Sequence, residues 1–207
     1  MRTDRQQVID WARALLADGS AVILDSETTG LDTTDEIVQL AIIDLSGQVL
    51  LDTYVKPSIP IPAAAQRIHG ITDAMVASSP TFDQVWPQIA TILAGRSTVI
   101  YNASYDTSKL VGSRACAGGA YEGDISGWWQ RYEQADAEIQ ALRFECAMER
   151  YAIYYGDYSD YFGSYKWKAL PGGDHSALGD AKATLNLIKR MAGHVDIGVA
   201  REQLTNE

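Results

Sequence analysis

Hydrophobic residues recur at helical spacing in the first stretch of the chain. Residues 3–18 form an amphipathic pattern that begins at Thr3, in capping-box spacing with Gln6, and is followed by Gly19. The apolar face of this pattern comprises Val8, Trp11, Ala12, Leu15 and Leu16. A polar N-cap, an apolar stripe and a glycine C-cap are typical of a surface helix. We therefore predict a helix over 3–18.

Short apolar runs after this helix predict strands separated by turn residues. Strands are expected over 21–24, ending abruptly at Asp25, and over 36–45, 48–55 and 98–101. Helices are expected over 63–69, 72–77, 82–94, 104–117 and 177–191. The stretch 118–170 is irregular and aromatic, with one helix expected near 139–154. This order, antiparallel at first, predicts an α/β fold with a mixed β-sheet flanked by helices.

The charge balance limits how this protein can bind its ligands. Its 207 residues are enough for one domain with a substantial core. Seventeen basic residues against 27 acidic ones give a net charge of −10. This excludes a module that grips nucleic acid through a basic face, although divalent cations would still allow contact with phosphates. The two cysteines have neither disulfide-framework nor zinc-site spacing.

The chain has no apolar stretch that approaches the roughly 20 residues needed to span a bilayer. Its first 19 residues carry several charges, so they lack the apolar segment of a secretory signal. We therefore expect a cytoplasmic protein without a membrane partner.

Asp25 and Glu27 directly follow the first predicted strand. At positions i and i+2 of an extended chain their side chains share a face, about 7 Å apart at the backbone, which suits two cations about 3.5–4 Å apart. The spacing alone is weak, because chance predicts about three or four such acidic pairs and the chain has three. A carboxylate pair against an apolar strand is costly without cations. A metal site and a solvated strand end both stay open at this point.

Two further acids and a histidine follow other predicted elements. Asp106 comes just after the strand 98–101, and Asp180 lies early in the last helix, five residues after His175. Five helical residues turn by about 140°, so His175 is expected on the preceding loop or the first turn. A histidine near carboxylates can act as a general base, although each residue taken singly could be an ordinary surface group.

Four short motifs occur in order along the chain. They are Asp25-Ser-Glu27-Thr-Thr-Gly30-Leu, Ile68-His-Gly-Ile-Thr-Asp73, Asn102-Ala-Ser-Tyr-Asp106 and His175-Ser-Ala-Leu-Gly-Asp180-Ala. Together they resemble the DEDDh (DnaQ-like) family of 3′→5′ exonucleases, which have a ribonuclease-H-like fold. The resemblance implies that His175 activates the attacking water. It also implies that two divalent cations, Mg²⁺ or Mn²⁺, are held by Asp25, Glu27, Asp106 and Asp180.

The resemblance further implies nucleotide contacts from residues beside the acids. These residues are Thr28, His69, Asn102 and Tyr105. Relatives often have a histidine where this chain has Tyr101, and phenylalanine is common at the position of Tyr105. Both departures lie on the substrate side and leave the catalytic positions filled. For His69, packing of a loop stays an alternative.

This resemblance predicts a metal-dependent exonuclease that releases nucleoside 5′-monophosphates from single-stranded DNA 3′ ends. An exoribonuclease on short RNA is the alternative, because contacts to a 2′-hydroxyl cannot be located in the sequence. A catalytically silent nucleic-acid-binding or interaction module of the same fold is a further alternative, although all five catalytic positions are filled.

The expected parts of the chain are a helical extension (1–19), an exonuclease domain (20–192) and a polar tail (193–207). The short tail does not indicate a polymerase tether; docking through a surface and the oligomeric state stay open.

Aromatic residues concentrate in one part of the chain. Six of the 11 tyrosines lie within 151–165, followed by Trp167. Aromatic rings can stack on unpaired bases, but the favoured interpretation is that the first three tyrosines pack a helix and the rest order a glycine-containing loop. Trp128 and Trp129 could form a packing lid or a partner surface, and the pattern does not decide between them.

Overall fold

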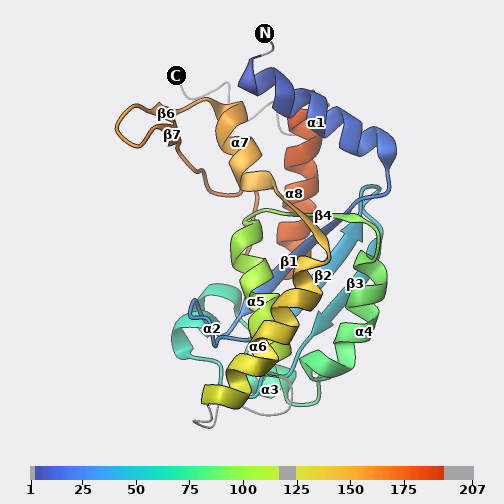
Figure 1. Cartoon of the computed structure of the whole chain (residues 1–207), viewed down its shortest axis with the longest axis vertical. Coiled ribbons are helices and arrows are strands. Elements are labelled where there is room, and N and C mark those ends of the chain that lie inside the picture. Colours follow the sequence, from blue (N-terminus) through green and yellow to red (C-terminus); the bar gives the residue numbers. More distant parts are fainter. Residues whose placement is uncertain (1–2, 117–124, 194–207) are drawn as a thin grey trace.

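A mixed sheet of five strands lies between layers of helices in the part of the chain that the structure describes (Figure 1). The computed structural model describes residues 3–116 and 125–193, so nearly all of the predicted tail lies outside the described residues. The strands are β1 (Val22–Thr28), β2 (Ile37–Asp44), β3 (Val49–Tyr54), β4 (Ser97–Ile100) and β5 (Arg143–Cys146). Their order is β3-β2-β1-β4-β5, with antiparallel pairing among β1, β2 and β3 and parallel pairing from β1 to β4 and β5. The predicted α/β fold with a mixed sheet is confirmed.

The helices form two layers and one small edge group. One face of the sheet packs against α1 (Asp4–Asp18), α7 (Ala147–Tyr155) and α8 (Ala177–Met191). The other face packs against α4 (Phe82–Leu93), α5 (Ala103–Ala115) and α6 (Ile125–Gln140). The two short helices α2 (Ala63–His69) and α3 (Asp73–Val76) pack in a separate cluster with β2. None of these described helices is long and apolar enough to cross a membrane.

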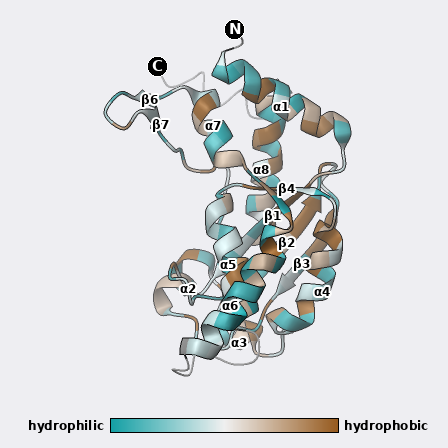
Figure 2. Cartoon of the chain, in the orientation of Figure 1, coloured by the Kyte–Doolittle hydropathy of each residue, from teal (hydrophilic) through white to brown (hydrophobic). Residues whose placement is uncertain are grey.

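Alternation along the strands produces the two cores, because successive side chains point to opposite faces of a sheet. Ile23 and Ile43 belong to the core under α1, α7 and α8, whereas Val22 and Leu24 belong to the core under α4, α5 and α6. In Figure 2 the strands around β2 carry hydrophobic colours, whereas α6 is coloured largely as hydrophilic. By the same alternation, the odd-numbered residues at the end of β1 face the α8 side.

Helix α1 shares its hydrophobic core with α7 and α8. Thr3 caps it by accepting a hydrogen bond from the Gln6 backbone at 3.2 Å, and Gly19 follows it with a φ of 69°, as the sequence predicts. The side chains that it buries are Val8, Ala12 and Leu15. The indole of Trp11 donates a hydrogen bond to Glu145 on β5 at 2.6 Å. The described part of this segment, residues 3–19, therefore packs onto the sheet domain through both apolar and polar contacts.

The second half of β1 has a strand neighbour on only one side. β2 pairs along the whole of β1, but β4 pairs with it only at Val22 and Ile23. After Ile100 the chain leaves the sheet and enters α5. The first turn of α5 meets the unpaired stretch of β1, because the Ser26 hydroxyl donates a hydrogen bond to Asp106 at 2.7 Å.

Two predictions of element boundaries are wrong. β1 does not end at Asp25 but continues through Thr28, because β2 pairs with it as far as Ile37. Residues 125–170, the described part of the stretch 118–170, are not largely irregular, and a helix does not begin near 139. They contain α6, β5 and α7, the last beginning at Ala147. β5 has four residues, which is too short for a periodic pattern to be recognised.

The aromatic segment divides into a buried and an exposed part. Tyr151 on α7 is buried, as the packing interpretation predicts, but Tyr155 on the same helix is 59% exposed, so the prediction is wrong for this tyrosine. A projecting hairpin of β6 (Tyr158–Ser159) and β7 (Ser164–Tyr165) carries most of the remaining rings, and several of them are exposed, so packing does not account for this part. Of the two adjacent tryptophans on α6, Trp128 is buried and Trp129 is exposed.

Leu15→Ala is expected to lower the free energy of unfolding by about 2–5 kcal/mol, because the substitution opens a cavity in the core that α1 shares with α8. Leu31→Ala is the matched control, since Leu31 is 85% exposed and should change stability by no more than about 0.5 kcal/mol. Urea unfolding followed by circular dichroism measures both. Equal effects of the two substitutions would contradict the packing of α1 described above.

Candidate active site

Two acidic side chains project from β1 toward the α8 side of the sheet. Asp25 and Glu27 lie two residues apart and share the face of Ile23, and Glu27 lies opposite Gln39 on β2. Asp25 is buried, and no described residue donates a hydrogen bond to its carboxylate. Glu27 is half-buried. A carboxylate held in this way is costly unless a cation compensates its charge.

The loop before α8 brings His175 and Asp180 to Glu27. Ser176 is the N-cap of α8, so Asp180 lies in its first turn and His175 on the loop, as predicted. The backbone N–H of Asp174 donates a hydrogen bond to the Asp180 carboxylate at 2.8 Å. His175 has a φ of 60°, a left-handed conformation that is uncommon outside glycine. Ligand atoms of Glu27, His175 and Asp180 all lie within 4.8 Å of one another.

Asp106 reaches the same region from the other layer of helices. It lies in the first turn of α5 and is buried, with the Ser26 hydroxyl as its hydrogen-bond donor. Both Asp106 and Asp180 therefore sit near helix N-termini, where the helix dipole favours negative charge. The acids that the sequence placed after strands and at a helix start thus converge from three elements.

Burial and mutual repulsion raise the pKa of three of these acids. Burial, followed by the charge of Asp106, holds the pKa of Asp25 well above its usual range, and Asp180 and Glu27 raise it further. Burial and then the charge of Asp180 raise the pKa of Glu27 to about 7. Burial raises the pKa of Asp106 to about 7, although the hydrogen bond from Ser26 lowers it. The four carboxylates therefore act as one electrostatic group.

Two of the predicted substrate-side residues meet beside a tight turn. The hydroxyl oxygens of Thr28 and Tyr105 lie 2.6 Å apart, and they lie 2.9 and 3.1 Å from the carbonyl oxygen of Gly30. A Cβ atom at Gly30 would lie 2.5 Å from the Asp35 carboxylate, so a larger residue would push this side chain away from the turn. The loop after β1 is therefore fixed against α5.

The other two predicted substrate-side residues flank the same end of β1. His69 Nδ1 accepts a hydrogen bond from the Ile71 backbone at 3.0 Å, so the Nε2–H of the neutral ring donates to the Thr28 carbonyl at 3.2 Å. Burial lowers the pKa of His69, which favours this neutral form. Asn102 is the N-cap residue of α5 and is half-buried. The structure thus brings His69 and Asn102 close to the strand and helix that carry the acids.

Three residues of the site had no clear signal in the sequence. Lys109 is almost fully buried. Its ammonium group donates a hydrogen bond to the Asp32 carbonyl and lies 5.1 Å from the ring centre of Tyr105. A single lysine on a predicted helix gives no indication of burial. Ser26 could not be assigned as a hydrogen-bond donor before the register of α5 on β1 was known. Asp174 follows two glycines and precedes a serine at i+2, a pattern that predicts a turn.

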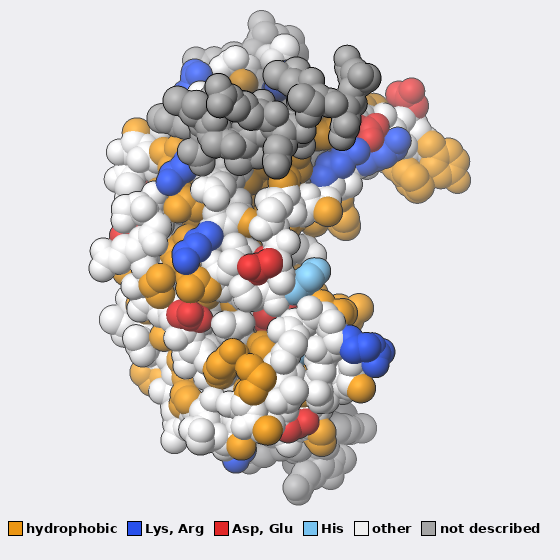
Figure 3. All heavy atoms as spheres, turned by 180° about the vertical axis from the view of Figure 1, so that it is seen from behind, with side chains coloured by type: hydrophobic (Ala, Val, Ile, Leu, Met, Phe, Trp, Pro, Cys, Tyr) orange, Lys and Arg blue, Asp and Glu red, His pale blue; other side chains and the backbone are white. Residues whose placement is uncertain are grey.

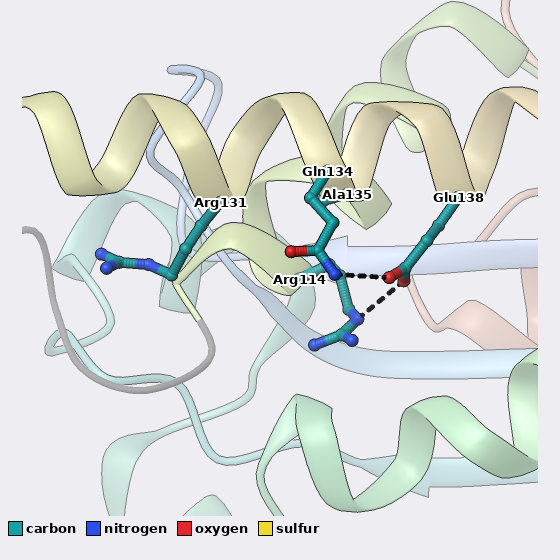
Figure 4. A pocket seen from close by; sticks show the side chains of 5 residues that line it. All are labelled: Arg114, Arg131, Gln134, Ala135 and Glu138. Atoms are coloured by element: carbon teal, nitrogen blue, oxygen red, sulfur yellow. Dashed lines mark hydrogen bonds and ion pairs between the residues drawn. The ribbon is translucent and has the colours of Figure 1, made fainter.

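A small pocket of about 120 Å³ lies elsewhere, between α5 and α6 (Figure 4). Arg114, which lines this pocket, forms an ion pair with Glu138 on α6 at 3.1 Å and another with Asp83 on α4 at 2.7 Å. Arg131 donates a hydrogen bond to the carbonyl of Ala115 at 2.9 Å. None of these residues belongs to the acidic group, and their pairings join three helices, so we assign the pocket a structural role.

Known proteins with similar sequences decide between the classes of function that this geometry allows. Uncharacterized exonuclease CP81 of Escherichia phage 186 is 37% identical over 182 residues, which cover 83% of this chain and 87% of that protein. A family model described as an exonuclease, RNase_T, matches residues 22–188. The chain belongs to the DEDDh exonuclease family. It is therefore a nuclease, a class of hydrolase.

Solved structures have the same fold as this DEDDh exonuclease. Exonuclease X in complex with 5′ overhanging duplex DNA is 26% identical with a TM-score of 0.51, and the match covers 84% of this chain and 93% of that one. E. coli Exonuclease I in complex with a 5cy-dT13 oligonucleotide is 17% identical with a TM-score of 0.54, covering 84% of this chain and 42% of that one. The expected ribonuclease-H-like fold is confirmed.

Raising the pH from about 5 to about 8 in EDTA is expected to destabilise this exonuclease. Between the usual carboxyl pKa and the raised values near 7, the folded protein holds protons that the unfolded chain has released. Stability is therefore highest at the acidic end of this range and falls as the pH approaches 7. Thermal unfolding at each pH measures the effect.

Asp25→Asn should reduce this pH dependence, because it removes a buried carboxyl group whose own raised pKa contributes to it. Glu133→Gln, at an exposed position on α6, is the matched control and should leave it unchanged. The pKa shifts would be contradicted if Asp25→Asn and Glu133→Gln had the same pH dependence as the native chain.

Proposed function

We propose that this protein is a metal-dependent 3′→5′ exonuclease that releases nucleoside 5′-monophosphates from single-stranded DNA. The observation that carries the proposal is the convergence of four mutually repelling carboxylates with His175 at the end of β1. All five belong to motifs that resemble those of DEDDh exonucleases. A catalytically silent member of the family would have no need to keep such a costly arrangement.

Two divalent cations would be held by the carboxylates of Asp25, Glu27, Asp106 and Asp180. The burial of Asp25 without a hydrogen-bond donor and the raised pKa values fit a site that is built for positive charge. The ligand atoms of these four residues are all oxygens, which select Mg²⁺ or Mn²⁺ rather than zinc or copper. When bound, the cations would stabilise charge on the entering and leaving oxygens. Members of the family generally use divalent metal ions.

His175 would act as the general base. Its exposed position on the loop before α8 gives solvent water access to the ring. The imidazole accepts a proton as the water oxygen forms a bond to phosphorus, and the bond from phosphorus to the 3′-oxygen of the preceding nucleotide breaks. The products are a nucleoside 5′-monophosphate and a strand shortened by one nucleotide, whose 3′-oxygen gains a proton.

DNA is the proposed polymer, and its free 3′ end is the proposed point of attack. Exonuclease X binds 5′ overhanging duplex DNA in its structure and Exonuclease I binds a 5cy-dT13 oligonucleotide, which supports this choice. Thr28, His69, Asn102 and Tyr105 surround the end of β1 and would contact the terminal nucleotide. A single strand suits the site because a base must leave the duplex stack before it can be enclosed.

Asp25→Asn and Asp180→Asn are each expected to lower the rate of oligonucleotide hydrolysis by at least about 100-fold, because each removes a proposed metal ligand. EDTA should abolish the activity of the native chain, and Mg²⁺ or Mn²⁺ should restore it, whereas Ca²⁺ should support binding without turnover. Asp136→Asn on α6 is the control and should hydrolyse at the native rate. Release of labelled mononucleotides measures the rate, and full activity in EDTA would overturn the proposal.

His175→Ala is expected to lower the hydrolysis rate by about 10²–10⁴-fold. The rate of the native enzyme should rise with pH as the imidazole loses its proton and then become constant, and the variant should lack this rise. His69→Ala serves for comparison in the pH–rate profile. It should keep the rise of the rate with pH, because the ring that it removes is already neutral and hydrogen-bonded within the protein. An unchanged pH–rate profile in His175→Ala would assign the proton transfer to another group.

A further inference from the structure

The hairpin of β6 and β7 presents large aromatic rings to solvent. The side chain of Tyr161 is 89% exposed, that of Phe162 75% and that of Trp167 67%. The rings of Tyr161 and Phe162 lie edge to face at the tip, with centroids 4.8 Å apart. Several exposed rings on one projection mark a contact surface, because single scattered apolar residues are the usual case on a monomer.

The root of the hairpin is fixed to the body of the protein. Tyr158 and Tyr165 pack edge to face across it with centroids 5.1 Å apart, and the Tyr165 hydroxyl donates a hydrogen bond to Asp4 on α1 at 3.3 Å. The hydroxyl of Tyr101, at the end of β4, donates a hydrogen bond to the carbonyl of Lys168 at 2.7 Å. The exposed rings are therefore carried on an arm with a defined direction rather than on a free loop.

This arm overhangs the side of the molecule that holds the active site. Figure 3 shows the hairpin projecting above a hollow whose wall carries a histidine side chain. The histidines among the described residues are His69 and His175, and both belong to the site. Of these three exposed rings, Tyr161 is the farthest from His175 along the chain and precedes it by 14 positions, so the two lie at most about 50 Å apart. At about 3.4 Å per stacked nucleotide, this distance corresponds to no more than about 15 nucleotides.

The charge of the hairpin favours a nucleic-acid strand more than the average surface of this acidic protein does. Its acids, Asp157 and Asp160, are balanced by Lys166 and Lys168, whereas the whole chain carries a net charge of −10. Lys166 and Lys168 both pair with Asp157, at 3.2 and 2.7 Å, and Figure 3 shows basic side chains at the root of the arm. Phosphates therefore meet little net repulsion here, and stacking on rings does not require positive charge.

We propose that Tyr161, Phe162 and Trp167 stack on unpaired bases of the substrate strand, on the 5′ side of the nucleotide that the acids hold. This inference rests on the proposed function, because it assumes that a single strand leads out of the active site. The arm binds any base, since every base has a π-face. It would let the enzyme retain a long strand between successive cleavages without a basic groove.

The test compares hydrolysis of a labelled 20-nucleotide oligothymidylate by the native chain and by Tyr161→Ala/Phe162→Ala. The double variant is expected to raise KM by at least about fivefold, the smallest loss for one stacked base, without a matching fall in kcat. Tyr161→Trp/Phe162→Trp keeps the rings and should restore KM, whereas Tyr161→Leu/Phe162→Leu should not. Val49→Ala, at an exposed position on β3, is the matched control and should keep the native KM.

Abasic residues in the oligonucleotide identify what the rings contact. A block of abasic sites within the roughly 15 nucleotides before the terminal one should raise KM for the native chain and have less effect on Tyr161→Ala/Phe162→Ala, because the interaction is already lost. An alanine variant with the native KM, or equal effects of the abasic block on both proteins, would overturn the inference. So would a change in sedimentation mass in the variant, which would assign the arm to contact between copies of the chain.

Failure of the proposed function gives a different result. A native chain that hydrolyses no oligonucleotide contradicts the exonuclease proposal, and fluorescence anisotropy with the same 20-mer still tests the arm. In that case a weaker binding of the alanine variant supports stacking, and equal binding contradicts it.

Discussion

The mutual repulsion of four carboxylates constrains everything built around the end of β1. Burial is the largest cause of the raised pKa values of Asp25, Glu27 and Asp106, and the charges of neighbouring carboxylates, that of Asp180 among them, add to it. Held together without cations, these groups destabilise the folded chain, so the surrounding structure must keep them in place at a net cost. That cost is understandable only if the site is used with bound positive charge.

The fold holds the group by anchoring its four acids to three rigid elements, β1, α5 and α8. Fully buried residues on both faces of β1 precede Asp25, so the strand cannot shift by one residue without exposing a core. Because β4 stops short, the first turn of α5 can bring Asp106 against the unpaired part of β1. Asp180 lies in the first turn of α8 and accepts a hydrogen bond from the loop that carries His175. The site therefore depends on strand register and on two helix starts.

Much of this arrangement could be predicted from local pattern, because the acids lie at strand ends and helix starts that periodicity and capping residues mark. The length of β1 could not be predicted in this way, because its last residues are part of the strand only through their pairing with β2. The helix α6 was not predicted, although Trp128, Ala135 and Ile139 form its buried face. The burial of Lys109 could not be predicted, because it comes from contact with a loop that is distant in sequence. The exposure of the hairpin rings likewise depends on where β6 and β7 project from the body.

Proton release on metal binding tests the central claim most directly. If the carboxylates form one group with raised pKa values, Mn²⁺ must displace protons from Glu27 and Asp106 near neutral pH. Calorimetric titration with Mn²⁺ in buffers of different ionisation enthalpy should show two ions bound, with protons released at about pH 6 and fewer at about pH 8. Binding enthalpies that do not depend on the buffer at about pH 6 would mean that the acids are already ionised, and would contradict the account.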